Sequence, residues 1–288
     1  MGYLHIENLY KDQTILLFRE CFALEKIHGS SADLKWKCEE GRLFYFSGGQ
    51  DRNRFFGLFN GAALHQLFAT KFPAHDVTVH GEVYGGKLHG MSETYGKDLK
   101  FIAFDVLVGD TWLGVENAAA LCESLCLEFV DFKRVPTTTE SLNHERDKPS
   151  TQAIRNGCGE GKTREGVVLR PVVEFRTNRT ANGGRIIAKH KCDAFRETKT
   201  PRVVSPEELK VLADARAIAE EWVTEMRLTH VLDKIPGAGI AQMREVLKAM
   251  TEDIVREGAG EFVDSKSARS YIGSKTAEMF KRRLSVTE

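Results

Sequence analysis

The sequence predicts an α+β fold with antiparallel sheets, followed by a small all-helical domain. Three observations predict it. Short β-rich runs alternate with helical segments over about the first 200 residues, neighbouring runs are joined by short turns, and the pattern is helical from Ser205 onward. Strands paired through short turns favour an α+β arrangement over a doubly wound parallel sheet.

The predicted strands are rich in Val, Ile and Phe and are bounded by Gly, Asn or charged residues. They cover residues 22–27, 42–47, 77–85, 100–108, 165–175 and 185–191. The sequence Asn182-Gly183-Gly184 is typical of a hairpin turn and separates the last two strands. Helical periods lie near residues 58–71 and 115–129.

A domain boundary is predicted near residue 202, which gives one domain over 1–202 and a second over 203–288. The second domain is expected to open with a helix that Ser205 caps. Glu208 can reach back to the cap, and Pro206 suits the first helical position.

The apolar residues of this helix are expected to share one face, as in an amphipathic helix. They are Val211, Ala215, Ile218, Ala219, Trp222 and Met226. Two further helices are predicted, one over 240–257 that Gly258 ends and one over 265–284.

The overall charge favours no particular partner. The chain has 288 residues with 41 Lys plus Arg and 41 Asp plus Glu, so nucleic-acid binding would have to come from a local patch. Its six cysteines form no CxxC pair, which indicates scattered thiols in a reducing compartment. No apolar run reaches the roughly 18 residues of a membrane span, and the start MGYLHI lacks the apolar core of a signal peptide. We expect a cytoplasmic protein.

Lys26 ends the apolar run FALEK and is followed by Gly29, a residue that leaves the lysine sterically open. A lysine attacks phosphorus only as the neutral amine, and its ordinary pKa is about 10.4. A nucleophilic role therefore requires partial burial or cationic neighbours. Lys189 and Lys191 supply such neighbours, because two residues that are two apart on a strand face the same way. We expect this pair to neutralise a phosphate and to favour a lysyl–phosphate bond at Lys26.

Glu82 and Glu165 stand beside glycines in strand contexts. Carboxylates in such positions can hold a ribose hydroxyl and Mg²⁺, the usual partner of nucleotide phosphates.

Five short motifs occur in a fixed order: KIHG at 26–29, GE at 81–82, FIAFD at 101–105, EGVVLRP at 165–171 and IAKHK at 187–191. Together they resemble the signature motifs of the covalent nucleotidyltransferases, which include polynucleotide ligases and messenger-RNA capping enzymes. The KIHG form is similar to the second phage class of ATP-dependent RNA ligases (RNA ligase 2 type), which is related to the RNA-editing ligases. The helical domain also resembles that class, at 222–227 and 252–254.

The resemblance implies a nucleotidyltransferase (ligase adenylylation) domain that uses ATP and Mg²⁺, with Mn²⁺ as an alternative. It implies that Lys26 takes AMP from ATP as a phosphoramidate, that Glu25 lies along the adenine pocket, and that Phe104 stacks on the adenine. The rest of the first motif contributes to the same nucleotide site through Ile27, His28 and Gly29.

The resemblance also assigns the remaining polar residues. It implies that Glu82 holds the ribose, that Glu165 serves the metal and the nucleotide, and that Lys189 and Lys191 contact the phosphates. Arg170 joins the nucleotide site at the end of the fourth motif. In the helical domain, Arg227 and Asp253 match positions that the family needs for sealing on RNA.

The chain departs from the family pattern in two places. Ser47 stands where the family usually has an arginine for the ribose, and Arg52 or Arg54 could replace that arginine. Arg170 stands where this class commonly has lysine, so the charge is kept while the geometry of the charged group changes.

Structural roles stay open for the same residues. The nucleophile and the two glutamates could be surface or strand-edge charges, Phe104 could be a core residue, and the lysine pair could be a solvated strand face. Arg227 could pair with Glu225, and Asp253 could lie on a helix surface. Two further segments are interpreted as structural: GCGEGKT at 157–163 lacks the glycine spacing of a phosphate loop, and the Pro-Gly stretch at 235–239 ends a helix.

We therefore predict an ATP-dependent RNA ligase that seals 3′-hydroxyl and 5′-phosphate ends, at nicks in duplex RNA or RNA–DNA hybrids. No membrane and no obligate protein partner is expected, and the location is the host cytoplasm if the protein is phage-encoded. The alternatives are a DNA ligase or capping-type nucleotidyltransferase, or an inactive nucleic-acid-binding protein with the ligase fold.

Overall fold

The computed structural model describes residues 2–174, 176, 184–202, 204, 214–235 and 237–287. The chain divides into two compact units, Met1–Cys192 and Asp193–Glu288. Among the described residues, no helix combines the length and the apolar character that crossing a membrane requires.

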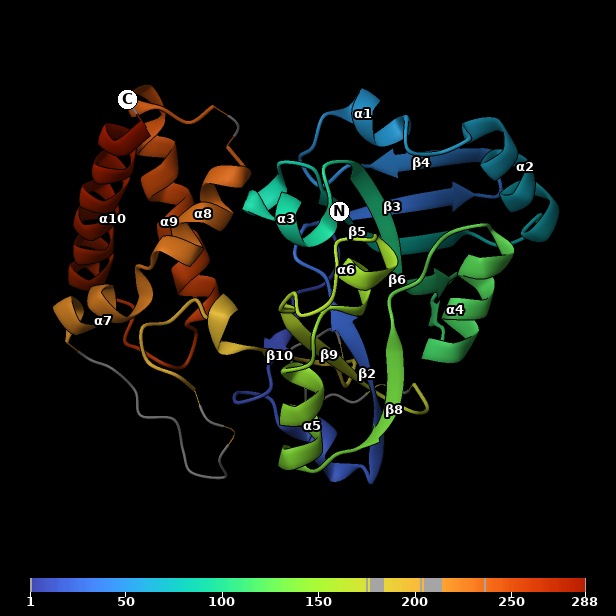
Figure 1. Ribbon diagram of the computed structural model, residues 1–288, viewed down its shortest axis with the longest axis horizontal. Helices are drawn as coiled ribbons and strands as arrows, with labels where there is room; N and C mark the ends of the chain where they lie inside the picture. The colour runs from blue at the N-terminus through green and yellow to red at the C-terminus, as the bar shows by residue number, and fades with distance from the viewer. Residues whose placement is uncertain are drawn as a thin grey trace. The chain divides into compact units, whose positions relative to one another are not determined.

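The first unit contains two five-stranded sheets (Figure 1). Sheet A has the order β1 (Glu7–Asn8), β10 (Ala188–Lys191), β9 (Gly166–Pro171), β2 (Glu20–Lys26), β8 (Phe132–Pro136). Sheet B has the order β4 (Arg42–Phe46), β3 (Ser30–Lys37), β5 (Val77–Gly85), β6 (Leu99–Val108), β7 (Thr111–Trp112). All neighbouring strands are antiparallel except β1 and β10. The predicted α+β class with antiparallel sheets is confirmed.

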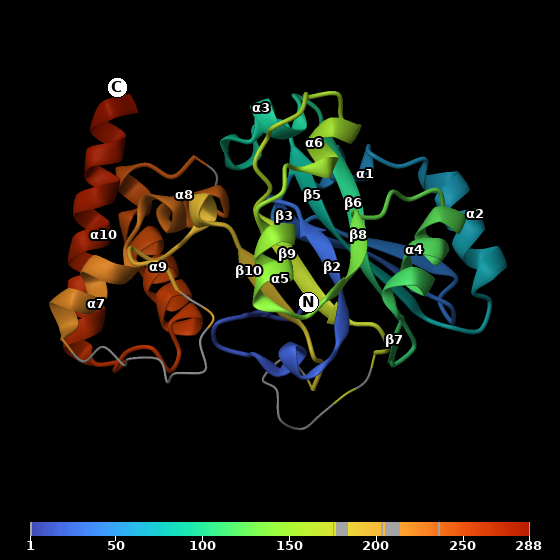
Figure 2. The ribbon, with the colours of Figure 1, turned by 60° about the horizontal axis from the view of Figure 1, so that its bottom comes forward.

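The α-helices of this unit are α1 (Arg52–Phe56), α2 (Gly61–Lys71), α3 (Ser92–Tyr95), α4 (Val115–Ser124), α5 (Thr139–Arg146) and α6 (Thr151–Arg155). Helices α2 and α4 lie against one face of sheet B, and α5 lies against sheet A (Figure 2). Leu64 and Phe68 of α2 pack with Val79 of β5 and Ala118 of α4 in the main core.

The predicted strands are present, and β5 has the predicted bounds of 77–85. The segments predicted as strands over 165–175 and 185–191 are shorter than expected, as β9 and β10. Strands β3 and β8 were not predicted, because both carry several charged residues among their apolar ones. Strands β1 and β7 were not predicted either, since two residues are too few to show a pattern. Asn182 and Gly183 of the predicted hairpin lie outside the described residues.

Both predicted helices of the first unit are shorter than the periodic pattern suggested. The helix expected from residue 58 begins at Gly61, because the Asn60 side chain accepts a hydrogen bond from the backbone N–H of Ala63 and caps it. The helix expected to reach residue 129 ends at Ser124, and Cys126 adopts a left-handed backbone with φ +57°.

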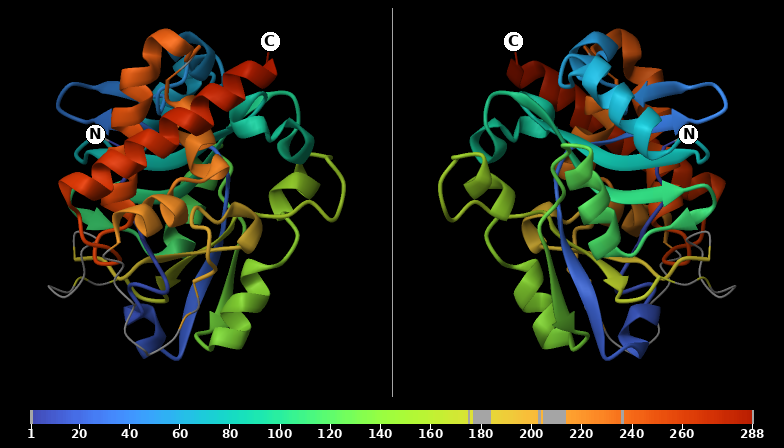
Figure 3. Two further views of the ribbon diagram at one scale, coloured as in Figure 1. Left: turned by 90° about the vertical axis from the view of Figure 1, so that its left-hand side faces the viewer. Right: turned by 90° about the vertical axis from the view of Figure 1, so that its right-hand side faces the viewer.

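The second unit contains α7 (Ala215–Trp222), α8 (Glu225–Asp233), α9 (Met243–Glu257) and α10 (Lys266–Thr287). Helix α10 packs against the other three helices (Figure 3, left, red). Ile218, Trp222, Leu228, Met250 and Phe280 are fully or almost fully buried in the core of this unit. The helical character predicted for this region is confirmed, and Gly258 stands at the end of α9 as predicted.

The first helix of this unit differs from its prediction. One helix was expected to continue through Met226, but α7 ends at Trp222 and a new helix starts at Glu225. The side chain of Thr224 accepts a hydrogen bond from the backbone N–H of Arg227, and this cap starts α8 in a new direction. The predicted helix start at Ser205, Pro206 and Glu208, together with Val211, lies outside the described residues.

A buried ion cluster joins the two sheets of the first unit. Asp105 of sheet B is completely buried and accepts hydrogen bonds from Arg170 of sheet A at 2.9 Å, from Arg185 at 2.6 Å and from the hydroxyl of Tyr3 at 2.5 Å. Glu174 pairs with the same two guanidinium groups. Because each charge is paired and hydrogen-bonded, the cluster can stay buried, and it sets the position of one sheet against the other.

The cluster generates a stability prediction. Asp105→Ala leaves Arg170 and Arg185 buried with part of their charge unpaired, and we expect it to lower the free energy of unfolding of the first unit by about 3–5 kcal/mol. Urea unfolding of the whole chain measures the change. The control is Glu20→Ala, which removes the exposed partner of Arg134 and is expected to cost at most about 1 kcal/mol. Equal losses in the two variants would contradict a special role for the cluster.

Candidate active site

The register of three strands in sheet A brings two of the predicted lysines to one place. Lys26 of β2 pairs with Gly166 of β9, and the same glycine pairs with Lys191 of β10. Gly166 has φ +147°, and a Cβ on it would lie 2.1 Å from the carbonyl oxygen of His190. Only glycine fits between the two lysine-bearing strands at this level.

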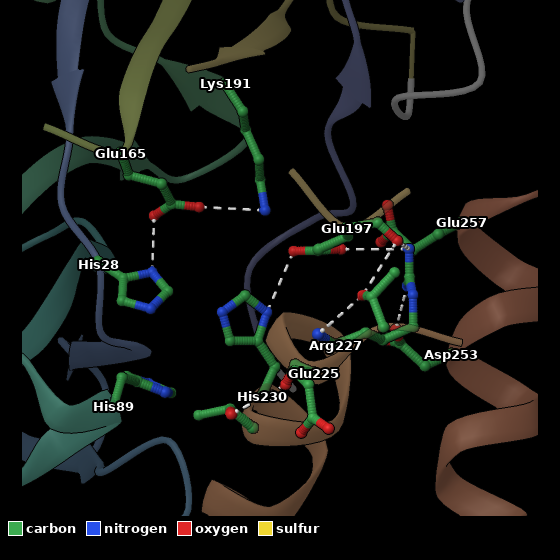
Figure 4. Close-up of polar contacts among 12 residues, drawn as sticks. His28, His89, Glu165, Lys191, Glu197, Glu225, Arg227, His230, Asp253 and Glu257 are labelled. Carbon is green, nitrogen blue, oxygen red and sulfur yellow. Dashed lines mark hydrogen bonds and ion pairs between the residues drawn. The ribbon is translucent and has the colours of Figure 1, made fainter. Parts of the chain in front are cut away.

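Glu165 connects the two lysines. Figure 4 shows its carboxylate between His28 and Lys191. Its carboxylate is 2 % exposed and accepts hydrogen bonds from Lys26 Nζ at 2.9 Å and from Lys191 Nζ at 3.1 Å. His28 Nδ1 lies 3.2 Å from the oxygen that Lys26 contacts. Burial by itself raises the pKa of Glu165, but the charges of Lys26, Lys191 and His28 outweigh burial and hold that pKa well below its usual value. The carboxylate is therefore an anion among three basic groups.

This arrangement differs from the expected one. Sequence reasoning placed Lys26 in one pocket with the cations Lys189 and Lys191 and with both glutamates, and it expected the cations to activate the amine. In the structure, the charged group that Lys26 contacts is the anion Glu165. The cation Lys191 lies beyond that carboxylate, on its other oxygen. A period-two pattern reports which side chains share a face of one strand, but not which residue of the adjoining turn reaches between two strands.

Glu82 approaches the same place from sheet B. A Cβ on Gly29 would lie 2.3 Å from the carbonyl oxygen of Val83 and 2.9 Å from Cγ of Glu82, so glycine is required for this close approach. Burial raises the pKa of Glu82 to about 7; the charge of Lys26 opposes this rise, and Glu165 adds to it. Glu82 is thus electrostatically coupled to both residues, and a cation that binds it near neutral pH must displace a proton.

Sequence reasoning did not identify the two residues that contact the turn around His28, which are Tyr95 and His89. The backbone N–H of His28 donates to the Tyr95 hydroxyl at 3.3 Å, and the ring of His89 lies 4.8 Å from that of His28. His89 Nε2 is 2.9 Å from the carbonyl oxygen of Gly29. Both partners come from the segment after β5, which has no periodic pattern that could have indicated them.

The two neighbours of Lys26 in the first motif are buried and hold the strand in place. Glu25 accepts hydrogen bonds from the Ser150 hydroxyl at 2.6 Å and from the backbone N–H of Gln152 at 3.2 Å, at the start of α6. Burial raises the pKa of Glu25, and these hydrogen bonds oppose the rise. Ile27 is 4 % exposed and packs in a core cluster with Tyr95.

Phe104 and Lys189 are placed at the margins of this group. Phe104 is half-buried and contacts Tyr3 edge-to-face at 4.9 Å. Lys189 faces the same side of β10 as Lys191 and is 9 % exposed. The pKa of Glu7 is lowered chiefly by a hydrogen bond from His5, and Lys189 contributes to this shift.

Two predicted nucleotide positions are engaged elsewhere. Arg170 is 1 % exposed and belongs to the ion cluster that joins the sheets, where it also donates to the carbonyl oxygen of Leu113 at 2.6 Å. Ser47 donates its hydroxyl to the carbonyl oxygen of Gln50 at 2.7 Å and so stabilises a turn. Neither contact is with the group around Glu165.

Arg227 and Asp253 lie in the second unit and pair with each other at 2.5 Å (Figure 4). Arg227 is 1 % exposed, pairs with Glu197 at 3.4 Å and has its guanidinium 5.3 Å from the ring of Trp222. Their contact with RNA stays a prediction. In the unit described, the pair holds α8 and α9 together.

The chemistry of the group around Lys26 fits a phosphate and a divalent cation. Lys26 and Lys191 offer ammonium groups for phosphate oxygens. Glu165 and Glu82 offer carboxylate oxygens, the ligands that Mg²⁺ and Mn²⁺ take. The site therefore combines ammonium groups for a phosphate with carboxylate oxygens for a cation, at the point where the two sheets approach each other.

Such a site, set between two antiparallel sheets, fits the binding of a nucleotide phosphate together with a divalent cation. The RNA ligase family matches residues 19–191, well over half of the chain. The chain therefore belongs to the RNA ligase family. No curated protein matches the sequence.

Solved structures of Naegleria gruberi RNA ligase are similar to the chain. A ligand-free mutant has a TM-score of 0.48 and 16 % identity, over 68 % of this chain and 56 % of that one. The enzyme with PPi and a mutant with ATP and Mn each have a TM-score of 0.48 and 15 % identity, over 68 % of this chain and 57 % of theirs. The chain spans a little over half the length of these structures.

Proposed function

We propose that the chain is an ATP-dependent RNA ligase that carries AMP on Lys26. The observation that carries this proposal is the row formed by Lys26, Glu165 and Lys191, in which one buried carboxylate pairs with two lysines at the ends of the two strands that flank β9. Membership of the RNA ligase family supports it. Residues 1–202, which include the whole first unit, would be the adenylyltransferase domain, and residues 203–288 would be the helical RNA ligase domain.

The reaction would proceed in three transfers. Lys26 Nζ attacks the α-phosphorus of ATP, the bond to the β-phosphate oxygen breaks, diphosphate leaves and the nitrogen loses a proton. The 5′-phosphate of an RNA end then displaces Lys26 from AMP, which gives an adenylylated end. A 3′-hydroxyl attacks that end, loses its proton, releases AMP and completes the phosphodiester bond.

The residues present have distinct roles in this proposal. Lys191 and Lys189 bind phosphate oxygens and stabilise the charge that develops on them. Glu82 holds the ribose, and Phe104 offers a ring for the adenine. Glu165 fixes Lys26 in place and, with Glu82, would hold Mg²⁺ or Mn²⁺. The cation would supply further stabilisation of phosphate charge.

We infer that the protein is of the second phage class and seals nicks in duplex RNA or RNA–DNA hybrids. The KIHG motif and the helical second unit support this assignment. Duplex pairing would preset the two ends in line, which lowers the entropic cost of the final step. Arg227 and Asp253 would act by keeping α8 and α9 in position for RNA. We further propose a cytoplasmic protein without an obligate protein partner.

Two alternatives are weaker. DNA ligases and capping enzymes carry a β-barrel after the fifth motif, whereas the described part of the second unit is built from α7 to α10 and short 3₁₀ turns. An inactive binding protein with the ligase fold would not require the paired lysines around Glu165.

Transfer of AMP to Lys26 can be tested directly. After incubation with ATP labelled at the α-phosphate and Mg²⁺, the protein is expected to carry label that resists alkali and is released by acid, as a lysine phosphoramidate is. Lys26→Ala should carry none, because no other group replaces the nucleophile. Lys133→Ala, which removes an exposed lysine of β8, should be labelled like the wild type. An unlabelled wild type would contradict the proposed function.

The preference for RNA over DNA at the nick can be tested separately. Matched nicked duplexes with RNA or DNA on either side of the nick separate an RNA ligase from a DNA ligase. We expect sealing when the strand ends are RNA and much slower sealing when both are DNA, measured as product on a denaturing gel. Equal or faster sealing of the all-DNA nick would assign the chain to the alternative class.

A further inference from the structure

The exposed face of strand β4 carries two phenylalanines and a cation that the proposed chemistry does not use. Leu43 and Tyr45 face the main core, so Arg42, Phe44 and Phe46 face the other side of sheet B. Phe44 is 37 % exposed and Phe46 is 39 % exposed. Two large rings exposed side by side on one strand face are unusual for a surface that contacts water alone.

Cations accompany these rings. Lys35 of β3 stands directly opposite Phe44 and is exposed, and the guanidinium of Arg42 lies 5.1 Å from the centre of the Phe44 ring. Neither Lys35 nor Arg42 forms an ion pair within the described part of the chain. Lys37, opposite Arg42, already pairs with Asp76. We call the group of Lys35, Arg42, Phe44 and Phe46 the β4 face.

The strand register connects the β4 face to the candidate active site. Glu82 pairs with Ser31 of β3, and Ser31, Asp33 and Lys35 share one side of that strand. Four residues along a strand correspond to about 13 Å, so the Lys35–Phe44 pair lies about that far from the Glu82–Ser31 pair on the same sheet face. Asp33, opposite Phe46, is only 7 % exposed, so its carboxylate lies beneath the surface.

We propose that the β4 face binds unpaired nucleotides of the RNA substrate next to the strand end that is sealed; this rests on the proposed function. Phe44 and Phe46 would stack on bases, and Lys35 and Arg42 would contact phosphates. Aromatic rings on a sheet with interleaved cations fit single-stranded RNA, because every base has a face for stacking and every linkage has a charge. A uniform duplex keeps its bases stacked on each other and presents none to the rings.

The substrate class of the proposed ligase is therefore RNA with an unpaired segment beside the junction. Such a segment would run from the nucleotide site across sheet B toward its β4 edge. This modifies the proposed function, in which both ends are paired in a duplex at the nick: the ends would still be paired there, and one strand would become unpaired as it leaves the duplex toward β4.

Binding titrations test the inference on the whole chain. The probes are a fluorescent 5′-phosphorylated single-stranded RNA and a blunt RNA duplex of the same sequence, followed by anisotropy. We expect Phe44→Ala and Phe46→Ala each to weaken single-strand binding by about fivefold or more, with a smaller effect on the duplex. Phe44→Tyr keeps a ring and should bind like the wild type. Leu17→Ala, which truncates an exposed residue elsewhere in the unit, is the matched control.

Salt dependence tests the two cations. Lys35→Ala and Arg42→Ala should each reduce the slope of log affinity against log salt by about 0.7 for single-stranded RNA. Lys71→Ala, on the helix that covers the opposite face of sheet B, should leave the slope unchanged. A slope that stays at the wild-type value in both Lys35→Ala and Arg42→Ala would overturn the phosphate role of the β4 face.

Three other results would also overturn the inference. Single-strand binding could be unaffected by both phenylalanine variants, or the duplex could lose as much affinity as the single strand. The wild type could also form a dimer that Phe44→Ala abolishes, which would assign this edge of sheet B to self-association. Labelling of Lys26 by ATP in the same variants separates these failures from failure of the proposed function, since the β4 face takes no part in that step.

Discussion

The buried carboxylate of Glu165 is the contact on which the candidate site depends. Lys26 and Lys191 lie on strands that flank β9, so their backbones are separated by two strand spacings, about 9.5 Å. The carboxylate spans this gap and pairs with both ammonium groups. Without it, two partly buried cations would face each other with no anion to hold their side chains toward the same point. A phosphate that enters the site would meet cations already in position.

The fold supplies what this contact requires. Gly166 leaves room for the strands to run side by side between the lysines, and Gly29 lets the turn after β2 approach β5 closely enough for Glu82 to be coupled to Lys26. The ion cluster around Asp105 joins sheet A to sheet B through Arg170. Arg170, which the motif comparison assigns to the nucleotide, thus fixes the two sheets that carry the other residues of the site.

The sequence predicted the class of fold and most of the longer strands of the first unit, because these depend on local periodicity. The five short motifs named Lys26, Glu165 and Lys191, which the structure brings together. It could not indicate the role of Arg170, whose partner Asp105 is 65 positions earlier and on the other sheet. It also missed the break between α7 and α8, since the apolar period continues to Met226 while Thr224 caps a new helix. Pairs between distant residues leave no trace in a local pattern, and a cap such as Thr224 is easily overlooked where the apolar period runs on past it.

The most direct measurement of the central claim is the rate of adenylyl transfer to Lys26 in Glu165→Gln, with thermal unfolding recorded in parallel. Glutamine keeps the shape of the side chain but removes the charge that holds both lysines. Loss of one preorganised electrostatic contact should slow the transfer at least about a hundredfold without unfolding the protein, whereas Glu160→Gln, at an exposed loop position, should not change it. A folded Glu165→Gln variant that transfers AMP within about twofold of the wild-type rate would contradict the account.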